Sequence, residues 1–146
     1  MDILLKLITN KYIYVPTLLW FAVQLFKLIT DIIKTKKFNF KRILGAGGMP
    51  SSHTAIVVSL ATLIGKDVGV DTPLFALAVI MSLVVMYDAA GVRRAAGKQA
   101  SLLNKIVETP GMSGLEVQEK LVEVLGHTPL QVIVGAILGI IVGLIF

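Results

Sequence analysis

Apolar residues in this chain gather into four runs separated by short polar segments. The runs cover residues 12–33, 54–65, 73–90 and 129–146. A helix that crosses a membrane needs roughly 17–25 mostly apolar residues. The first, third and fourth runs reach that length, and the second reaches it only if its helix begins at Ser51. The pattern predicts an all-α fold, a polytopic membrane helix bundle with about four spanning helices.

The polar segment before the last run predicts a helix of a different kind. Ser113 and Glu116 have the spacing of a capping box. Leucine and valine residues then repeat on one face until Gly126, which is placed to end the helix. We therefore expect an amphipathic surface helix over residues 114–125. The length of the chain favours a single membrane-embedded domain, residues 1–146.

Composition narrows the classes of function. The chain is 55% hydrophobic, has a formal net charge of +5 and contains no cysteine, which excludes disulfides and thiol catalysis. Its basic residues are concentrated outside the apolar runs, which favours anionic lipid headgroups and control of topology rather than nucleic acid. No small-residue cleavage pattern follows the first run, so we expect that run to remain in the mature protein.

The candidate chemistry centres on the two histidines of the chain. His53 and His127 each stand at the start of an apolar helix, in "SSHTAIVV" and "LGHTPLQV", and each is followed by threonine. A helix N-terminus offers unpaired backbone N–H groups and a partial positive charge, which together favour an anion. Two such helix starts facing each other would form a phosphate pocket lined by two imidazoles. The alternative is that both histidines are interfacial residues at helix starts.

Basic residues after the third run could contribute to such a pocket. Arg94 and Lys98 lie four residues apart and would share a helix face, where a bound anion would offset their mutual repulsion. The alternative is a basic anchor beside the membrane. Two histidines without any cysteine give little support for a zinc site, so no metal or other cofactor is predicted.

Glycines recur every four residues in the last run, at Gly135, Gly139 and Gly143. Small residues at this spacing let helix backbones approach closely in lipid. The spacing indicates a packing face inside one bundle, with the seam of a homo-oligomer as the alternative.

Three segments, "MPSSHTA", "YDAAGVRRAAGKQA" and "GHTPLQV", together resemble the small divergent branch of the type 2 phosphatidic acid phosphatase and vanadium-dependent haloperoxidase superfamily, over nearly the whole chain. The resemblance implies a helical bundle that removes phosphate from lipids or other phosphoesters without a metal. It implies that His53 is the general acid and that His127 is the nucleophile that becomes phosphorylated. The residues expected to bind the phosphoryl oxygens are Arg94, Lys98, Ser51, Ser52, Lys41 and Arg42.

The chain departs from the superfamily pattern around the second histidine. Leu121 stands where the pattern has arginine, and Gln131 stands where it has the aspartate that orients the nucleophile. Gln131 and Asp88 are therefore the candidates for the orienting group. Two hypotheses follow: a lipid phosphatase with a histidine nucleophile and a histidine acid, or a non-catalytic membrane protein that binds anionic lipid or scaffolds partners with a degenerate pocket.

Charge predicts which side of the cell membrane the site faces. The loop 34–48 carries five basic residues, the segment 90–128 carries another five, and the connection 66–72 has one lysine against two aspartates. Because cytoplasmic loops are enriched in lysine and arginine, we expect both basic segments in the cytoplasm. His53 follows the first segment and His127 ends the second. The sequence thus predicts a multi-pass protein whose site faces the cytoplasmic leaflet, where a membrane phospholipid is the substrate.

Overall fold

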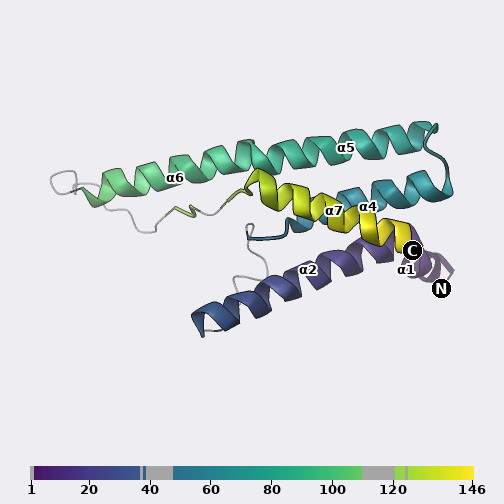
Figure 1. Ribbon diagram of the computed structural model, residues 1–146, viewed down its shortest axis with the longest axis horizontal. Helices are drawn as coiled ribbons and strands as arrows, with labels where there is room; N and C mark the ends of the chain where they lie inside the picture. The colour runs from purple at the N-terminus through teal and green to yellow at the C-terminus, as the bar shows by residue number, and fades with distance from the viewer. Residues whose placement is uncertain (1, 37, 39–47, 110–120, 124) are drawn as a thin grey trace.

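The regular structure of this chain is helical. The computed structural model describes residues 2–36, 38, 48–109, 121–123 and 125–146. Within them lie α1 (Asp2–Thr9), α2 (Lys11–Thr35), α4 (Ser52–Asp67), α5 (Pro73–Ala90), α6 (Val92–Glu108) and α7 (Pro129–Ile145) (Figure 1). The expectation of an all-α fold is confirmed.

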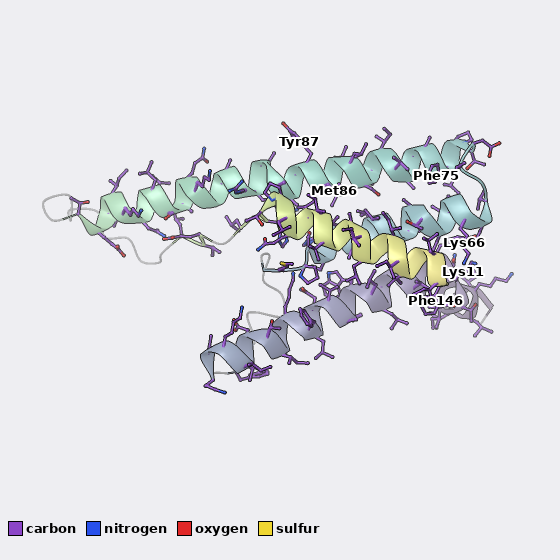
Figure 2. All side chains as sticks on the ribbon, viewed as in Figure 1. Lys11, Lys66, Phe75, Met86, Tyr87 and Phe146 are labelled. Atoms are coloured by element: carbon purple, nitrogen blue, oxygen red, sulfur yellow. The ribbon has the colours of Figure 1, made fainter. Side chains whose placement is uncertain are left out.

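Helix α4 forms the centre of the bundle and packs against α2, α5 and α7. Its buried positions are mostly small or polar residues, including Ser52, Thr54, Ala55, Ser59 and Ala61. Large apolar side chains face outward instead. On α5 only Ser82 and Ala89 are buried, and Tyr87 projects away from the other helices (Figure 2). Small residues inside and large apolar residues outside suit a bundle surrounded by lipid tails.

Within the described residues, two helical stretches are long and apolar enough to cross a membrane. They are Lys11–Thr35 and Pro73–Glu108, while α7 is a shorter apolar helix. At 1.5 Å per residue, the 16 residues of α4 extend about 24 Å, less than the roughly 30 Å of a typical hydrocarbon core. Two candidate spans are therefore present, and the expected four spans stay a prediction.

The direction of the helices brings the two histidine segments to one end of the bundle. Helices α4 and α7 both begin at this end, which we call the histidine end, whereas α2 and α5 run toward it (Figure 1). The opposite end is closed by polar contacts. Lys11 pairs with Asp67 at 2.7 Å, and Lys66 Nζ donates to the carbonyl of Leu144 at 3.0 Å (Figure 2). Both histidines therefore belong to the histidine end, where α2 ends and α6 begins.

The glycines of α7 are the face along which it meets α4. A Cβ atom on Gly135 would come within 2.6 Å of the Ser51 carbonyl, and one on Gly139 within 2.8 Å of the Ala55 carbonyl. A Cβ atom on Gly143 would come within 2.6 Å of the Cβ atom of Thr62. The expected packing face inside one bundle is confirmed. Helix α4 occupies this face in the single chain. This packing does not test a homo-oligomer through the same glycines, which stays a prediction.

The predicted amphipathic helix over 114–125 is wrong at its C-terminal end. Residues 114–120 and 124 lie outside the described residues, and residues 121–123 and 125 are not helical. The Asn104 side chain of α6 donates to the Leu121 carbonyl at 2.9 Å and accepts from the Leu121 N–H at 3.0 Å. A side chain of another helix therefore satisfies the backbone groups that a helix would have paired internally.

Candidate functional site

His127 lies on the non-helical segment that leads into α7, and this segment meets the end of α5. Its side chain is buried, with the residue only 2% exposed. The backbone N–H donates to the carbonyl of Ala89 at 3.0 Å, and the ring Nδ1 lies 3.2 Å from Oε1 of Gln131. The first contact holds the backbone of His127, and the second orients its ring.

The first turn of α7 determines which nitrogen of His127 carries the proton. Thr128 and Gln131 form a capping box, in which the Thr128 N–H donates to Gln131 Oε1 at 3.0 Å. A backbone N–H can only donate, so the amide atom facing it must be the oxygen. The same oxygen can only accept from His127, which places the ring proton on Nδ1. The Nε2 atom then carries the lone pair.

Nε2 of His127 is buried, and no described residue forms a hydrogen bond with it. The ring belongs to a small pocket whose lining also includes His53, Asp88 and Arg93. The pocket has a volume of about 10 Å³, room for roughly one water molecule. The structure thus brings the two predicted histidines into one pocket, and a phosphoryl group would require this pocket to widen.

Ser51 and Ser52 determine how His53 enters the pocket. Ser51 caps α4, since its Oγ accepts from the backbone N–H of Thr54 at 3.3 Å, and its own N–H donates to the carbonyl of Gln131 at 3.0 Å. The starts of α4 and α7 are thereby held together. Both serines are buried, and in this arrangement the Ser51 hydroxyl oxygen is occupied within the helix cap.

The cation that lines the pocket is Arg93, not Arg94. Arg93 Nε lies 2.5 Å from Oδ2 of Asp88. Arg94 and Lys98 are exposed and do not line the pocket, so the structure does not bring these two predicted phosphate ligands to the histidines. Successive helical residues point about 100° apart, and the backbone at Arg94 is covered by Gly126.

Lys41 and Arg42, the other two predicted basic ligands, lie outside the described residues. The two candidates for the orienting group can be compared directly. Gln131 forms the hydrogen bond to the His127 ring, whereas Asp88 lines the pocket and pairs with Arg93. The structure therefore associates His127 with the amide rather than with the carboxylate.

Lys27 is, besides Arg93, a second cation near the site that the sequence alone did not identify. It is only 3% exposed, and its Nζ lies 3.5 Å from Oγ of Ser52, beside His53 in the chain. Lys27 lies inside the first apolar run, where the hydrophobic pattern indicates only a spanning helix. A charged residue inside such a helix is costly to bury and usually functional, and this is the signal by which it could have been found.

The surroundings of His127 favour its neutral form. Burial lowers the pKa of the ring below its ordinary value near 6.5, and the charges of Lys27 and His53 lower it further. The hydrogen bond to Gln131 and the backbone of Gly48 oppose this shift but are outweighed. His127 is therefore an unprotonated imidazole at neutral pH, the form that can act as a nucleophile.

Sequence comparison identifies the class of protein to which this site belongs. Residues 8–142 match the Divergent PAP2 family. The match covers nearly the whole chain, and the chain therefore belongs to the Divergent PAP2 family. It is 38% identical over 133 residues to a protein of Bacillus subtilis (strain 168) named "Uncharacterized membrane protein YuiD", with 84% of each chain covered. No solved structure matches the chain.

Proposed function

We propose that this protein is a membrane-embedded phosphatase that hydrolyses the phosphomonoester of a lipid, with His127 as nucleophile and His53 as general acid. One observation carries the proposal. The buried Nε2 lone pair of His127 has no hydrogen-bond partner among the described residues and belongs to a pocket shared with His53. Membership of a PAP2-related family supports phosphate chemistry at that pocket.

In the first step, Nε2 of His127 attacks the phosphorus atom. The new N–P bond forms as the bond from phosphorus to the lipid oxygen breaks, and His53 donates a proton to the departing oxygen. The imidazole of His127 is then cationic and keeps its proton on Nδ1, where Gln131 Oε1 accepts the hydrogen bond. An amide stabilises this cation less than a carboxylate would, because it carries no charge.

In the second step, water attacks the phosphohistidine. His53, now neutral, accepts a proton from that water, and the N–P bond breaks to release inorganic phosphate and restore His127. Arg93 and Lys27 supply positive charge for the phosphoryl oxygens, where most of the gain in phosphoryl transfer arises. The positions of the two side chains support these roles, because Arg93 lines the pocket and Lys27 contacts Ser52.

The membrane arrangement is part of the same proposal. Helices α2, α4, α5 and α7 cross the bilayer with the histidine end in the cytoplasm. Their alternating directions support this arrangement (Figure 1), as does the concentration of basic residues in the segments 34–48 and 90–128. The substrate is then a phospholipid of the cytoplasmic leaflet.

The test is phosphate release by purified protein in detergent micelles, from a panel of lipid phosphomonoesters without added metal. The wild-type chain should release phosphate, and quenching in alkali should trap an acid-labile phosphate on His127. His127→Ala should abolish both signals, with turnover at least about 10⁴-fold lower. Leu130→Ala, at an exposed position on the first turn of α7, is the matched control and should retain activity. Full turnover in His127→Ala would refute the proposal.

A second candidate function is supported by the closed pocket. A volume of about 10 Å³ does not admit a phosphoryl group, and an amide replaces the carboxylate of the superfamily pattern. A non-catalytic protein that binds anionic lipid or scaffolds partners with this degenerate pocket would have both features. Lipid phosphate that binds without release of phosphate, in the assay above, would favour this candidate.

A further inference from the structure

Two adjoining cavities lie between α2 and α7 and are distinct from the pocket that holds the histidines. The first is polar, has a volume of about 430 Å³, and its lining includes Lys27, Lys34 and Gln131. The second is an apolar groove of similar volume, about 430 Å³. Phe26 and Met49 line both, so the groove continues directly into the polar cavity.

The two helices change character together along this groove. On α2, the face that lines the cavities is apolar from Leu19 to Phe26 and polar from Lys27 to Lys34. On α7, Leu138 and Val134 line the groove and Gln131 lines the polar cavity. Helix α2 runs toward the histidine end and α7 begins there, so the polar C-terminal part of α2 and the polar first turn of α7 lie at the same end (Figure 1). The two helices also diverge at this end. The surface between them is therefore apolar at one end and cationic at the other.

The polar cavity adjoins the reactive residues through two contacts. Gln131 lines the cavity and holds the ring of His127. Lys27 lines the cavity and reaches Ser52, the residue before His53. A phosphate group held in the cavity would thus lie beside the histidine pocket.

We infer that the groove between α2 and α7 binds one acyl chain of a phospholipid whose phosphomonoester headgroup occupies the polar cavity. The inference rests on the proposed function, since it names how the lipid substrate reaches that site. The apolar stretch from Leu19 to Phe26 extends about 10 Å along the helix, enough to bury a substantial part of one chain. The lipid enters sideways from the bilayer, chain and headgroup together.

Charge selects the headgroup. Among the described residues that line the cavity, Lys27 and Lys34 accompany one acidic residue, Asp31, so the described lining has a positive balance. Lys27 is buried in a helix that is long and apolar enough to span a membrane, a position where a cation is retained for a ligand or a relay rather than for solubility. A phosphomonoester complements this balance, whereas a zwitterionic headgroup would bring a further cation. We therefore expect phosphatidic acid to bind and phosphatidylcholine not to compete.

The experiment uses phosphatidic acid with a photoreactive group in one acyl chain, added to the full-length protein in micelles. After irradiation, digestion and mass spectrometry should locate adducts on residues 19–26 of α2 and 134–138 of α7. Excess unlabelled phosphatidic acid should suppress these adducts, and excess phosphatidylcholine should not. Adducts spread over the outward face of α5, or equal suppression by both lipids, would overturn the inference.

A matched pair of variants tests the groove itself. Ala22 lines the groove, and Ala76 is an equally exposed alanine on α5 that lines neither cavity. Ala22→Trp should lower the suppressible labelling about tenfold by filling the groove, and Ala76→Trp should leave it unchanged. Equal effects of the two variants would overturn the inference.

Labelling does not depend on turnover, so the inference and the proposed function can fail separately. Specific labelling of the groove without phosphate release would support the inference and refute the phosphatase. For an active enzyme, Ala22→Trp should lower kcat/KM for the lipid and leave hydrolysis of a short water-soluble phosphomonoester unchanged. An equal loss on both substrates would contradict binding of the acyl chain in this groove.

Discussion

The two histidines stand in matching sequence contexts but in different surroundings. His127 is buried, with its backbone bonded to Ala89 and its ring bonded to Gln131. His53 is half-buried in the first turn of α4, and its ring makes no hydrogen bond to any described residue. A nucleophile must present one lone pair in a constant direction, whereas an acid must turn toward the departing oxygen. The difference in surroundings is consistent with the proposed division of roles, and it shows that a shared motif need not mean a shared environment.

The largest effect expected from the less constrained histidine comes from removing it. His53→Ala should lower kcat about 10²–10⁴-fold for an alkyl phosphate, because the departing oxygen loses its proton donor. The loss should shrink for an aryl phosphate whose leaving group needs little protonation. Steady-state kinetics on a series of leaving groups measures this. A loss that is equal across the series would mean that His53 does not act as the acid.

The hydrogen bond that distinguishes His127 can be broken at Gln131. Gln131→Leu should lower kcat roughly 10–100-fold, because the ring loses the acceptor that keeps the proton on Nδ1. Gln131→Glu keeps an oxygen at this position and should retain activity. Because the chain has only two histidines, nitrogen NMR of histidine-labelled protein can read the tautomer directly. The wild type should show His127 protonated on Nδ1, and the leucine variant should show a mixture of the two tautomers. An unchanged tautomer in the leucine variant would contradict the claim that Gln131 determines which ring nitrogen is protonated.

Two adjacent arginines test which cation serves the shared pocket. Arg93→Gln should lower kcat/KM about tenfold, since Arg93 lines the pocket. Arg94→Gln should have little effect, since Arg94 does not line it. The two variants remove the same charge from adjacent residues. Any effect of the lost charge on membrane binding should therefore be the same in both variants and cancel when they are compared. A larger loss in Arg94→Gln would favour the ligand set expected from the sequence.

The smallest expected effect is a displacement of the pH profile. Burial lowers the pKa of His127 below its ordinary value near 6.5, so the neutral nucleophile persists to lower pH than a free imidazole would. With an aryl phosphate, which needs little acid catalysis, kcat/KM should stay level as pH falls through 6.5 and decline only at lower pH. Gln131→Glu should move this decline upward, because a carboxylate stabilises the imidazolium. A wild-type decline above pH 6.5 would contradict the buried neutral ring.

Local signals in the sequence were sufficient for the four apolar helices α2, α4, α5 and α7 and for the starts of α4 and α7. Ser51 and Thr128 cap these helices as their side-chain oxygens permit, and Pro129 begins α7. The position of both histidines at helix starts follows from these caps, which involve only residues a few positions apart. The glycine spacing of α7 likewise indicated the packing face, because a close helix contact requires the small residues themselves.

The tertiary structure alone decided which charges accompany the histidines. Arg93 rather than Arg94 lines the pocket. The sequence could not show this, because residue spacing does not record how α6 is rotated against the segment that contains Leu125 and His127. Lys27 comes from a helix 26 residues before His53, and only the packing of α2 on α4 brings it to Ser52. Leu121 lies beside α6 rather than in a helix of its own because Asn104 satisfies its backbone N–H and carbonyl. Each outcome depends on contacts between residues distant in the chain, whose energies no local pattern records.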